Sequence, residues 1–203
     1  MKTENVVLMN MAEESLKGKW GLAVRTSVVY ILIAGAILVT TEFFPISRLV
    51  TLIIGGPMCV GFSIFALSIS RNQNAEFGQI FKGFNIFGTS SAAYLLTVLF
   101  TLLWGLLLIV PGIIAALSYS MTFFIIADDN SIGAMDAINK SKKMMVGYGW
   151  KLFCLYLRFL GWTLLCFLTL GIGFLWLIPY MNVSIAKFYD DIKASSIATA
   201  NIN

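Results

Sequence analysis

The sequence predicts an all-α, polytopic membrane protein: six transmembrane helices arranged as three hairpins, each preceded by an amphipathic interfacial helix. Of the 203 residues, 59% are apolar and 12% are charged, whereas soluble domains carry roughly 45–50% and about 25%. No Asp, Glu, Lys or Arg occurs in residues 26–41, 49–70, 83–127 and 159–186. Since roughly 20 apolar residues cross a hydrocarbon core about 30 Å thick, this pattern excludes a soluble monomer.

Breaks at Gly, Pro and charged residues divide these stretches into six spans. In order, the predicted spans are residues 21–41, 49–70, 88–109, 111–127, 152–170 and 173–189. The last two are closely spaced, because Gly171-Ile172-Gly173 must turn the chain almost at once. A re-entrant hairpin is the alternative for this pair.

A threefold repeat is predicted from segments that look alike. Each odd-numbered span follows a glycine with an aromatic residue close behind, and the three glycines are separated by 65 and 64 residues: Gly18, Gly83 and Gly147. Each even-numbered span is predicted to open at a proline, where the missing N–H costs nothing: Pro57, Pro111 and Pro179. We therefore expect a single membrane domain over 1–203, with units 3–70, 71–127 and 128–193 and a disordered tail over 194–203. Alternatively, these residues simply mark membrane boundaries.

Two interfacial helices have amphipathic patterns. In the first, Met9, Ala12, Leu16 and Trp20 share one helical stripe. The second is predicted over residues 130–146. Its N-terminus would be favoured by Asp128, Asp129 and Ser131, and its C-terminus by lysines, in agreement with the helix dipole.

Basic residues predict the orientation, because Lys and Arg concentrate on the cytoplasmic side of membrane proteins. With six spans, every basic residue except Arg48 falls on one side, so both termini are predicted to be cytoplasmic. The net charge of +4 is then explained by topology and by anionic membrane lipids. No nucleic-acid partner is expected, because no basic motif interleaved with aromatic residues is present.

Catalytic and metal chemistry is not expected. The chain has no His, and Cys59, Cys154 and Cys166 are too far apart for usual zinc or iron–sulfur spacing. No Ser or Cys can have a His partner, and no glycine-rich phosphate loop is present. The sequence therefore predicts no catalytic residue, no metal and no cofactor, and a protein that is not an enzyme.

Three sets of candidate functional residues remain. Lipid contact near the inner surface is predicted for Lys140, Lys142, Lys143, Lys151 and Trp150. The alternative is that this lysine cluster only fixes the membrane topology. An intramembrane polar site could include Arg158, Asn182 and Tyr119, because ionisable and polar groups inside a membrane are functional candidates. Snorkelling or ordinary interhelical hydrogen bonding is the alternative. Close helix packing is predicted for the small residues Gly112, Ala116 and Ser120.

The C-terminal half resembles a known family. The residues that carry the resemblance are Ala137-Ile138-x-x-Ser141, Trp150-x-Leu152-Phe153, Phe159-Leu160-Gly161-Trp162 and Phe188-Tyr189-Asp190-Asp191. Together they resemble the bacterial integral-membrane family catalogued as domain of unknown function 975. The resemblance implies a six-helix membrane protein of Gram-positive type bacteria, distantly similar to membrane domains of glycerophosphodiester phosphodiesterases. It implies no activity, and Arg158 departs from the small or apolar residue expected there.

The function expected from these features is that of an integral protein of a bacterial cell membrane with a role in envelope homeostasis. It would act on lipid, preferably anionic lipid, or on a membrane-protein partner or a second copy of itself. The alternative is a transporter or exporter of small molecules or lipids, with a polar site in the helix bundle.

Overall fold

The computed structural model describes residues 3–43 and 47–200, which form helices and contain no strand. The first three helices are α1 (Asn5–Leu16), α2 (Trp20–Phe43) and α3 (Ser47–Ser70). They are followed by the 3-10 helix η1 (Phe77–Ile86), α4 (Phe87–Leu107), α5 (Ile109–Tyr119) and α6 (Thr122–Asp128). The last three are α7 (Ala134–Met145), α8 (Gly149–Leu168) and α9 (Phe174–Ala200).

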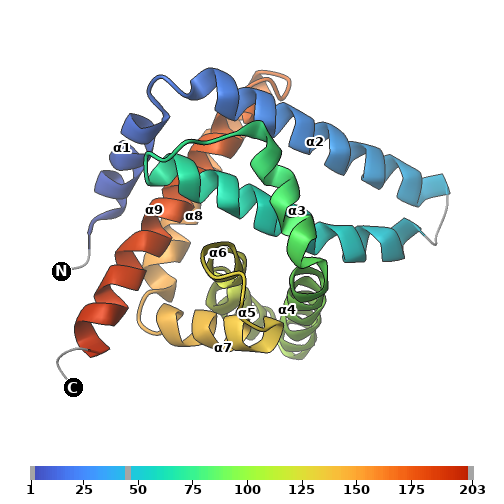
Figure 1. Ribbon diagram of the computed structural model, residues 1–203, viewed down its shortest axis with the longest axis vertical. Coiled ribbons are helices and arrows are strands. Elements are labelled where there is room, and N and C mark those ends of the chain that lie inside the picture. The colour runs from blue at the N-terminus through green and yellow to red at the C-terminus, as the bar shows by residue number, and fades with distance from the viewer. Residues whose placement is uncertain (1–2, 44–46, 201–203) are drawn as a thin grey trace.

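The element order repeats a short helix followed by a pair of long helical segments. The short helices are α1, η1 and α7, and the pairs are α2–α3, α4 with α5–α6, and α8–α9. The pairs diverge in Figure 1: α2 and α3 extend to the right, α4 and α5 are seen nearly end-on, and the α8–α9 connection is at the top. The described helices therefore do not form a bundle of parallel spans.

Several segments are long and apolar enough to cross a membrane, which indicates a membrane protein. The four that qualify are Thr51–Ser70, Phe77–Leu107, Ile109–Asp128 and Gly149–Leu168. Within the described residues, α1 and α2 form a fifth candidate as a pair bent by 100°, and α9 is not among the candidates. The sixth span therefore stays a prediction. The side chains of residues 40–50, including Arg48 of the predicted outer loop, lie outside the described part.

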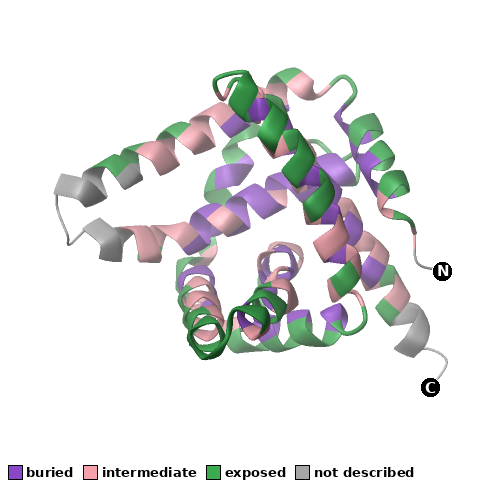
Figure 2. Cartoon of the chain, turned by 180° about the vertical axis from the view of Figure 1, so that it is seen from behind, coloured by how far each residue is buried: buried purple, intermediate pink, exposed green. Residues whose placement is uncertain are grey.

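Exposed apolar residues gather at the connections of the long helices. At the α4–α5 connection Ile109 is 78% exposed, and at the α8–α9 connection Leu170 is 94% exposed. Figure 2 shows these two connections as exposed segments at the ends of their helix pairs. Soluble monomers rarely expose apolar patches of this extent, so these ends fit a lipid environment.

Some predicted boundaries are wrong. Pro57 and Pro179 lie inside α3 and α9 instead of at their starts, and Pro111 is the third residue of α5. The predicted span 111–127 agrees with the candidate span Ile109–Asp128, although the helix is interrupted between α5 and α6 at Ser120 and Met121. In an apolar environment backbone N–H and C=O groups must form hydrogen bonds within the protein, and a helix satisfies most of them. The chain therefore stays helical on both sides of each proline. Likewise, α9 continues to Ala200 through residues predicted as a disordered tail, and residues 201–203 lie outside the described part.

The helix predicted over 130–146 is α7, and it begins later than expected. Its N-cap is Gly133. Asp129 instead closes the preceding loop, where its Oδ1 accepts hydrogen bonds from the N–H and the Oγ of Ser131 at 3.1 and 2.6 Å. Such local bonding by Asp competes with capping. Asp136 in the first turn and Lys142 and Lys143 in the last turn agree with the helix dipole.

The first and third short helices enter their long helices in the same way. Gly18 and Gly147 have φ values of +79° and +76°, which glycine adopts without the steric cost of a Cβ. The residue after each glycine donates its N–H to the last residue of the preceding helix, at 2.9 and 3.0 Å. The bounds of α1 and α7 are also offset by the same interval, 129 residues, that separates the two glycines. The two segments are thus equivalent in local structure.

The buried faces of α1 and α7 follow the same offset. The buried residues are Leu8, Met9, Ala12, Ser15 and Leu16 in α1, and Ala137, Ile138, Ser141, Met144 and Met145 in α7. Each short helix packs against the second long segment of the preceding pair: α7 against α5 and α6, η1 against α3, and α1 against α9. The three helix pairs are therefore closed into a ring by the short helices.

A charged clasp, formed by Arg71, Asp128, Asp190 and Lys193, joins the C-terminal ends of α3 and α6 to the C-terminal half of α9. Arg71 donates to Asp128 at 2.6 Å and to Asp190 at 2.7 Å, and Lys193 pairs with Asp128. The hydrogen bond to Asp190, with help from Asp128, raises the pKa of Arg71 above its usual range although burial opposes this. One arginine thus connects the second long segment of all three pairs.

A neighbouring ion pair brings two further chain segments to the same end. Lys151 near the start of α8 lies 2.7 Å from Asp191 of α9. Thr3 also donates its hydroxyl to Asp191. The N-terminal segment and the start of α8 therefore lie at the same end of the molecule as the charged clasp.

Candidate functional site

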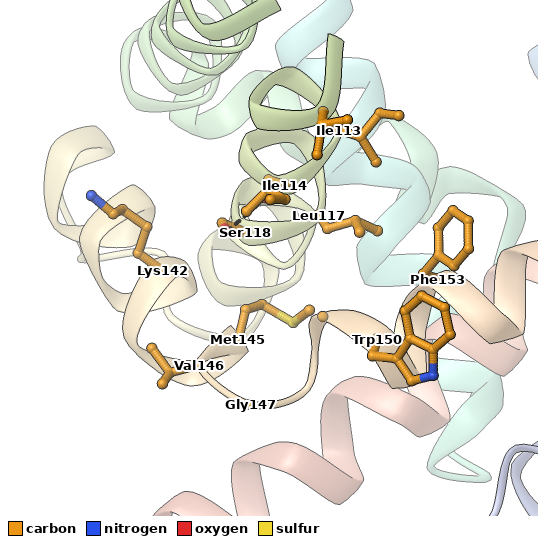
Figure 3. A pocket seen from close by; sticks show the side chains of 12 residues that line it. Ile113, Ile114, Leu117, Ser118, Lys142, Met145, Val146, Gly147, Trp150 and Phe153 are labelled. Carbon is orange, nitrogen blue, oxygen red and sulfur yellow. Dashed lines mark hydrogen bonds between the residues drawn. The ribbon is translucent and has the colours of Figure 1, made fainter. Parts of the chain in front are cut away.

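An apolar groove lies between α5, α7 and α8. Its volume is about 650 Å³, within the range of small-molecule and lipid-sized sites. Figure 3 shows α5 side chains on one wall and Trp150 and Phe153 of α8 opposite them. The groove is lined by Val110, Ile113, Ile114, Leu117, Ser118, Lys142, Met145, Val146, Gly147, Gly149, Trp150 and Phe153.

Specific contacts hold the walls of this groove in place. The fully buried Ser141 of α7 donates its hydroxyl to the carbonyl of Ser118 in α5 at 2.7 Å. Gly147 turns the chain from α7 into α8 and so places Trp150 beside the groove. The rings of Trp150 and Phe153 stack with centroids 5.4 Å apart. The groove is thus built by the turn between the short helix and the long helix.

Lys142 is the positively charged residue among those that line this groove. Lys142 projects from α7 on the side of the groove away from Trp150 (Figure 3). Lys140 and Lys143 are exposed on α7 but do not line the groove. Lys151 is turned toward Asp191 and lies 5.2 Å from the ring centre of Phe188. Of the five residues predicted to contact lipid, Lys142 and Trp150 therefore line this groove, at opposite edges.

The three residues of the predicted intramembrane polar site have different surroundings in the structure. Arg158 is exposed on α8 and lines a second pocket. The Asn182 side-chain amide donates to the carbonyl of Ile178, one turn back in its own helix, at 2.9 Å. Tyr119 is buried, with its ring 6.1 Å from that of Phe100. Within the described part of the chain, no cavity considered is lined by more than one of these three residues.

The predicted packing residues are placed differently from one another. Gly112 is buried at the α4–α5 contact, where a Cβ would lie 2.7 Å from the Cα of Gly105. Ala116 is exposed, and the half-buried Ser120 donates its hydroxyl to the carbonyl of Leu117 at 2.7 Å. The buried residues of α5 are Gly112, Ala115 and Tyr119. A step of three residues followed by a step of four returns to the same face of an α-helix, which is why Gly112, Ala115 and Tyr119 are buried together. Two steps of four, from Gly112 to Ala116 and Ser120, turn progressively away from that face.

Sequence reasoning missed most of the groove. Ile113, Ile114 and Leu117 lie in a segment that is apolar all round, so periodicity did not distinguish the groove wall from other apolar faces. A signal was present in α7: Met145 and Val146 come directly before the predicted boundary glycine, on the helix that also carries Lys142. Among the described residues, no group of three or more His, Cys, Asp or Glu could hold a metal ion.

Comparison with known proteins finds one family. The model of the family described as "Protein of unknown function (DUF975)" matches residues 106–196, which include α5 to α8, most of α9 and every residue that lines the groove. No curated protein and no solved structure matches the chain. The match supports a domain of this family over these residues, and its description carries no activity.

Proposed function

We propose that the whole chain belongs to this family and crosses a bacterial cell membrane six times, with both termini on the cytoplasmic side. The charged clasp and the Lys151–Asp191 pair support this topology, because residues that form an ion pair lie on the same side of the membrane. The chain then crosses the membrane an even number of times between the paired residues. Charged groups of this kind are costly inside hydrocarbon, so this end of the molecule is assigned to the inner surface. The thirteen basic residues expected on the inner side agree with this assignment.

We further propose that the protein binds an anionic phospholipid, with an acyl chain in the groove between α5, α7 and α8. The observation that supports this most strongly is an apolar groove of about 650 Å³ with Lys142 at one edge and Trp150 at the other. An amphiphile with a negative headgroup complements this combination of surfaces. Tryptophan is also common at the level of lipid headgroups.

The selectivity should come from the headgroup. An acyl chain that moves from the bilayer into the groove exchanges one apolar environment for another. Its transfer therefore has little hydrophobic driving force. A basic residue near an anionic surface contributes about 1 kcal/mol, which corresponds to roughly a fivefold preference. Lys142 is therefore expected to raise the occupancy of anionic over neutral lipid by about this factor.

Lipids that co-purify with the protein test this proposal. Lys142→Gln should lower the retained fraction of phosphatidylglycerol about fivefold, while Lys82→Gln, an exposed lysine of η1 away from the groove, should not. Leu117→Trp should fill the groove and lower retention of all phospholipids, with Leu102→Trp on the exposed face of α4 as its control. Equal retention in all four variants would contradict lipid binding at this groove.

The proposed role is non-enzymatic: the protein acts on membrane lipid, or on a membrane-protein partner or a second copy, in envelope homeostasis. The different surroundings of Arg158, Asn182 and Tyr119, of which only Arg158 lines a described pocket, favour this role over a transporter with one shared polar site. Transport would be supported if reconstituted protein caused flux of a small molecule that was lost in Asn182→Leu. We expect no such flux.

A further inference from the structure

A second pocket lies directly beside the lipid groove. Its volume is about 570 Å³, and it is formed by the N-terminal residues 3–6 and one face of α8. Gly147 and Trp150 line both cavities. Trp150, which is 75% exposed, thus stands between an apolar groove and a pocket with charged walls.

The α8 wall of this pocket is cationic. Lys151, Cys154 and Arg158 follow one another at intervals of three and four residues, so they share one helical face. Arg158 is nine residues beyond the start of α8, roughly 14 Å at 1.5 Å per residue. It lies inside a candidate span, where an ionisable residue is expected to have a function. Among the described residues no ion pair involves Arg158.

The wall of the pocket formed by residues 3–6 carries hydrogen-bond acceptors. The side-chain N–H of Asn5 donates to the carbonyl of Lys151 at 2.8 Å, which fixes the amide against α8. Its Oδ1 is buried and has no hydrogen-bond partner among the described residues. The carboxylate of Glu4 belongs to the same wall. A buried acceptor without a partner is uncommon and suits a ligand that carries a donor.

We propose that this pocket binds the headgroup of the phospholipid whose acyl chain occupies the groove, and that the headgroup is a phosphodiester with its own hydrogen-bond donor. Arg158 would bind the phosphate directly, since guanidinium groups match phosphate oxygens in geometry and charge, whereas Lys142, across the groove, would attract the headgroup charge at longer range without touching it. A hydroxyl or ammonium group of the same headgroup would donate to Asn5 Oδ1 and Glu4. This inference rests on the proposed lipid binding and adds the class of headgroup.

Native mass spectrometry of the full chain in detergent can test this with two anionic lipids. Phosphatidylglycerol carries hydroxyl donors beyond its phosphodiester, whereas phosphatidic acid has no group beyond its phosphate. The wild type should retain phosphatidylglycerol better than phosphatidic acid. Arg158→Gln should lower retention of phosphatidylglycerol about tenfold, as for a lost charge-assisted hydrogen bond. Arg25→Gln, which removes an arginine from α2 outside this pocket, is the matched control.

Two further variants separate the pocket from a general loss of folding. Cys154→Phe should fill the space beside Arg158 without changing any charge, and should lower phosphatidylglycerol retention while thermal unfolding stays cooperative. Asn5→Leu should abolish the preference over phosphatidic acid. The inference is overturned if Arg158→Gln and Cys154→Phe retain lipids as Arg25→Gln does, or if the wild type holds phosphatidic acid equally well.

The source of the phosphodiester is tested by competition. Soluble glycerophosphoglycerol at millimolar concentration should leave the bound lipid in place, because it lacks the chain that fills the groove. Full displacement would overturn the lipid assignment in favour of a soluble ligand. If Leu117→Trp and Lys142→Gln lower retention but Arg158→Gln does not, lipid binding stands and the headgroup pocket fails. If Leu117→Trp and Lys142→Gln have no effect, the proposed function itself fails.

Discussion

At the scale of single residues, backbone conformation at the two turn glycines decides how the short helices meet the long ones. Gly147 links the helix that carries Lys142 to the helix that carries Trp150. Its φ of +76° lies in a region where a side chain is strained. The groove geometry therefore depends on this residue although it contributes no side chain.

Gly147→Ala should destabilise the protein by about 1 kcal/mol, because alanine at positive φ clashes with its own backbone. Gly149→Ala is the control, since it lies two residues away with open space around its Cβ position and no positive φ. Unfolding by SDS in mixed micelles measures both. Equal midpoints for the two variants would show that the turn bears no strain.

At the scale of elements, the contact of α3 with η1 brings two backbones unusually close. A Cβ at Gly61 would lie 1.8 Å from the carbonyl oxygen of Ile80, and one at Gly83 would lie 1.9 Å from that of Pro57. Small residues permit such close approach between helices in membranes. Through this contact η1 attaches the second helix pair to the first.

Gly83→Ala should therefore cost roughly 3 kcal/mol, at the upper end of the usual range for overpacking. The clash is with backbone, which cannot move aside as a flexible side chain can. Gly78→Ala in the same element meets no atom within 4 Å and should leave stability nearly unchanged. Thermal unfolding in detergent compares the two. A Gly83→Ala protein as stable as Gly78→Ala would contradict this close packing.

At the scale of the whole molecule, the membrane topology is the main question. If α8 and α9 both cross the membrane, their connection at Leu170 faces outward; if they form a re-entrant hairpin, it stays within the bilayer. The exposure of Leu170 fits either case, because both place it against lipid or at the lipid surface. A chemical probe applied from outside the cell distinguishes them.

Substituted cysteines in a background without Cys59, Cys154 and Cys166 provide this probe. A membrane-impermeant thiol reagent should label Leu170→Cys in intact cells and should label Lys140→Cys in opened cells alone. The reason is that the connection is external in a six-span protein while α7 lies on the inner surface. Labelling of position 140 from outside would reverse the orientation, and failure at position 170 in intact cells would favour the re-entrant hairpin.

The sequence by itself determined the helical class, the apolar character of the long segments and the approximate positions of two of the three short helices, α1 and α7. These features depend on local composition and on the spacing of Gly, Pro and charged residues. The glycine interval between Gly18 and Gly147 also anticipated the equal offset of α1 and α7. Local signals of this kind act within a few residues, so they can be recognised without knowing what packs against them.

The tertiary structure alone decided which faces meet. Four charged side chains, from α6, α9 and the end of α3, became one clasp, Lys151 paired with Asp191, and Gly112 packed beside Ala115 and Tyr119 instead of Ala116. In a segment that is apolar all round, the pattern does not mark which side is buried. The groove and the pocket beside Trp150 arise where α1, α5, α7 and α8 converge, and that convergence depends on contacts between residues more than 100 positions apart.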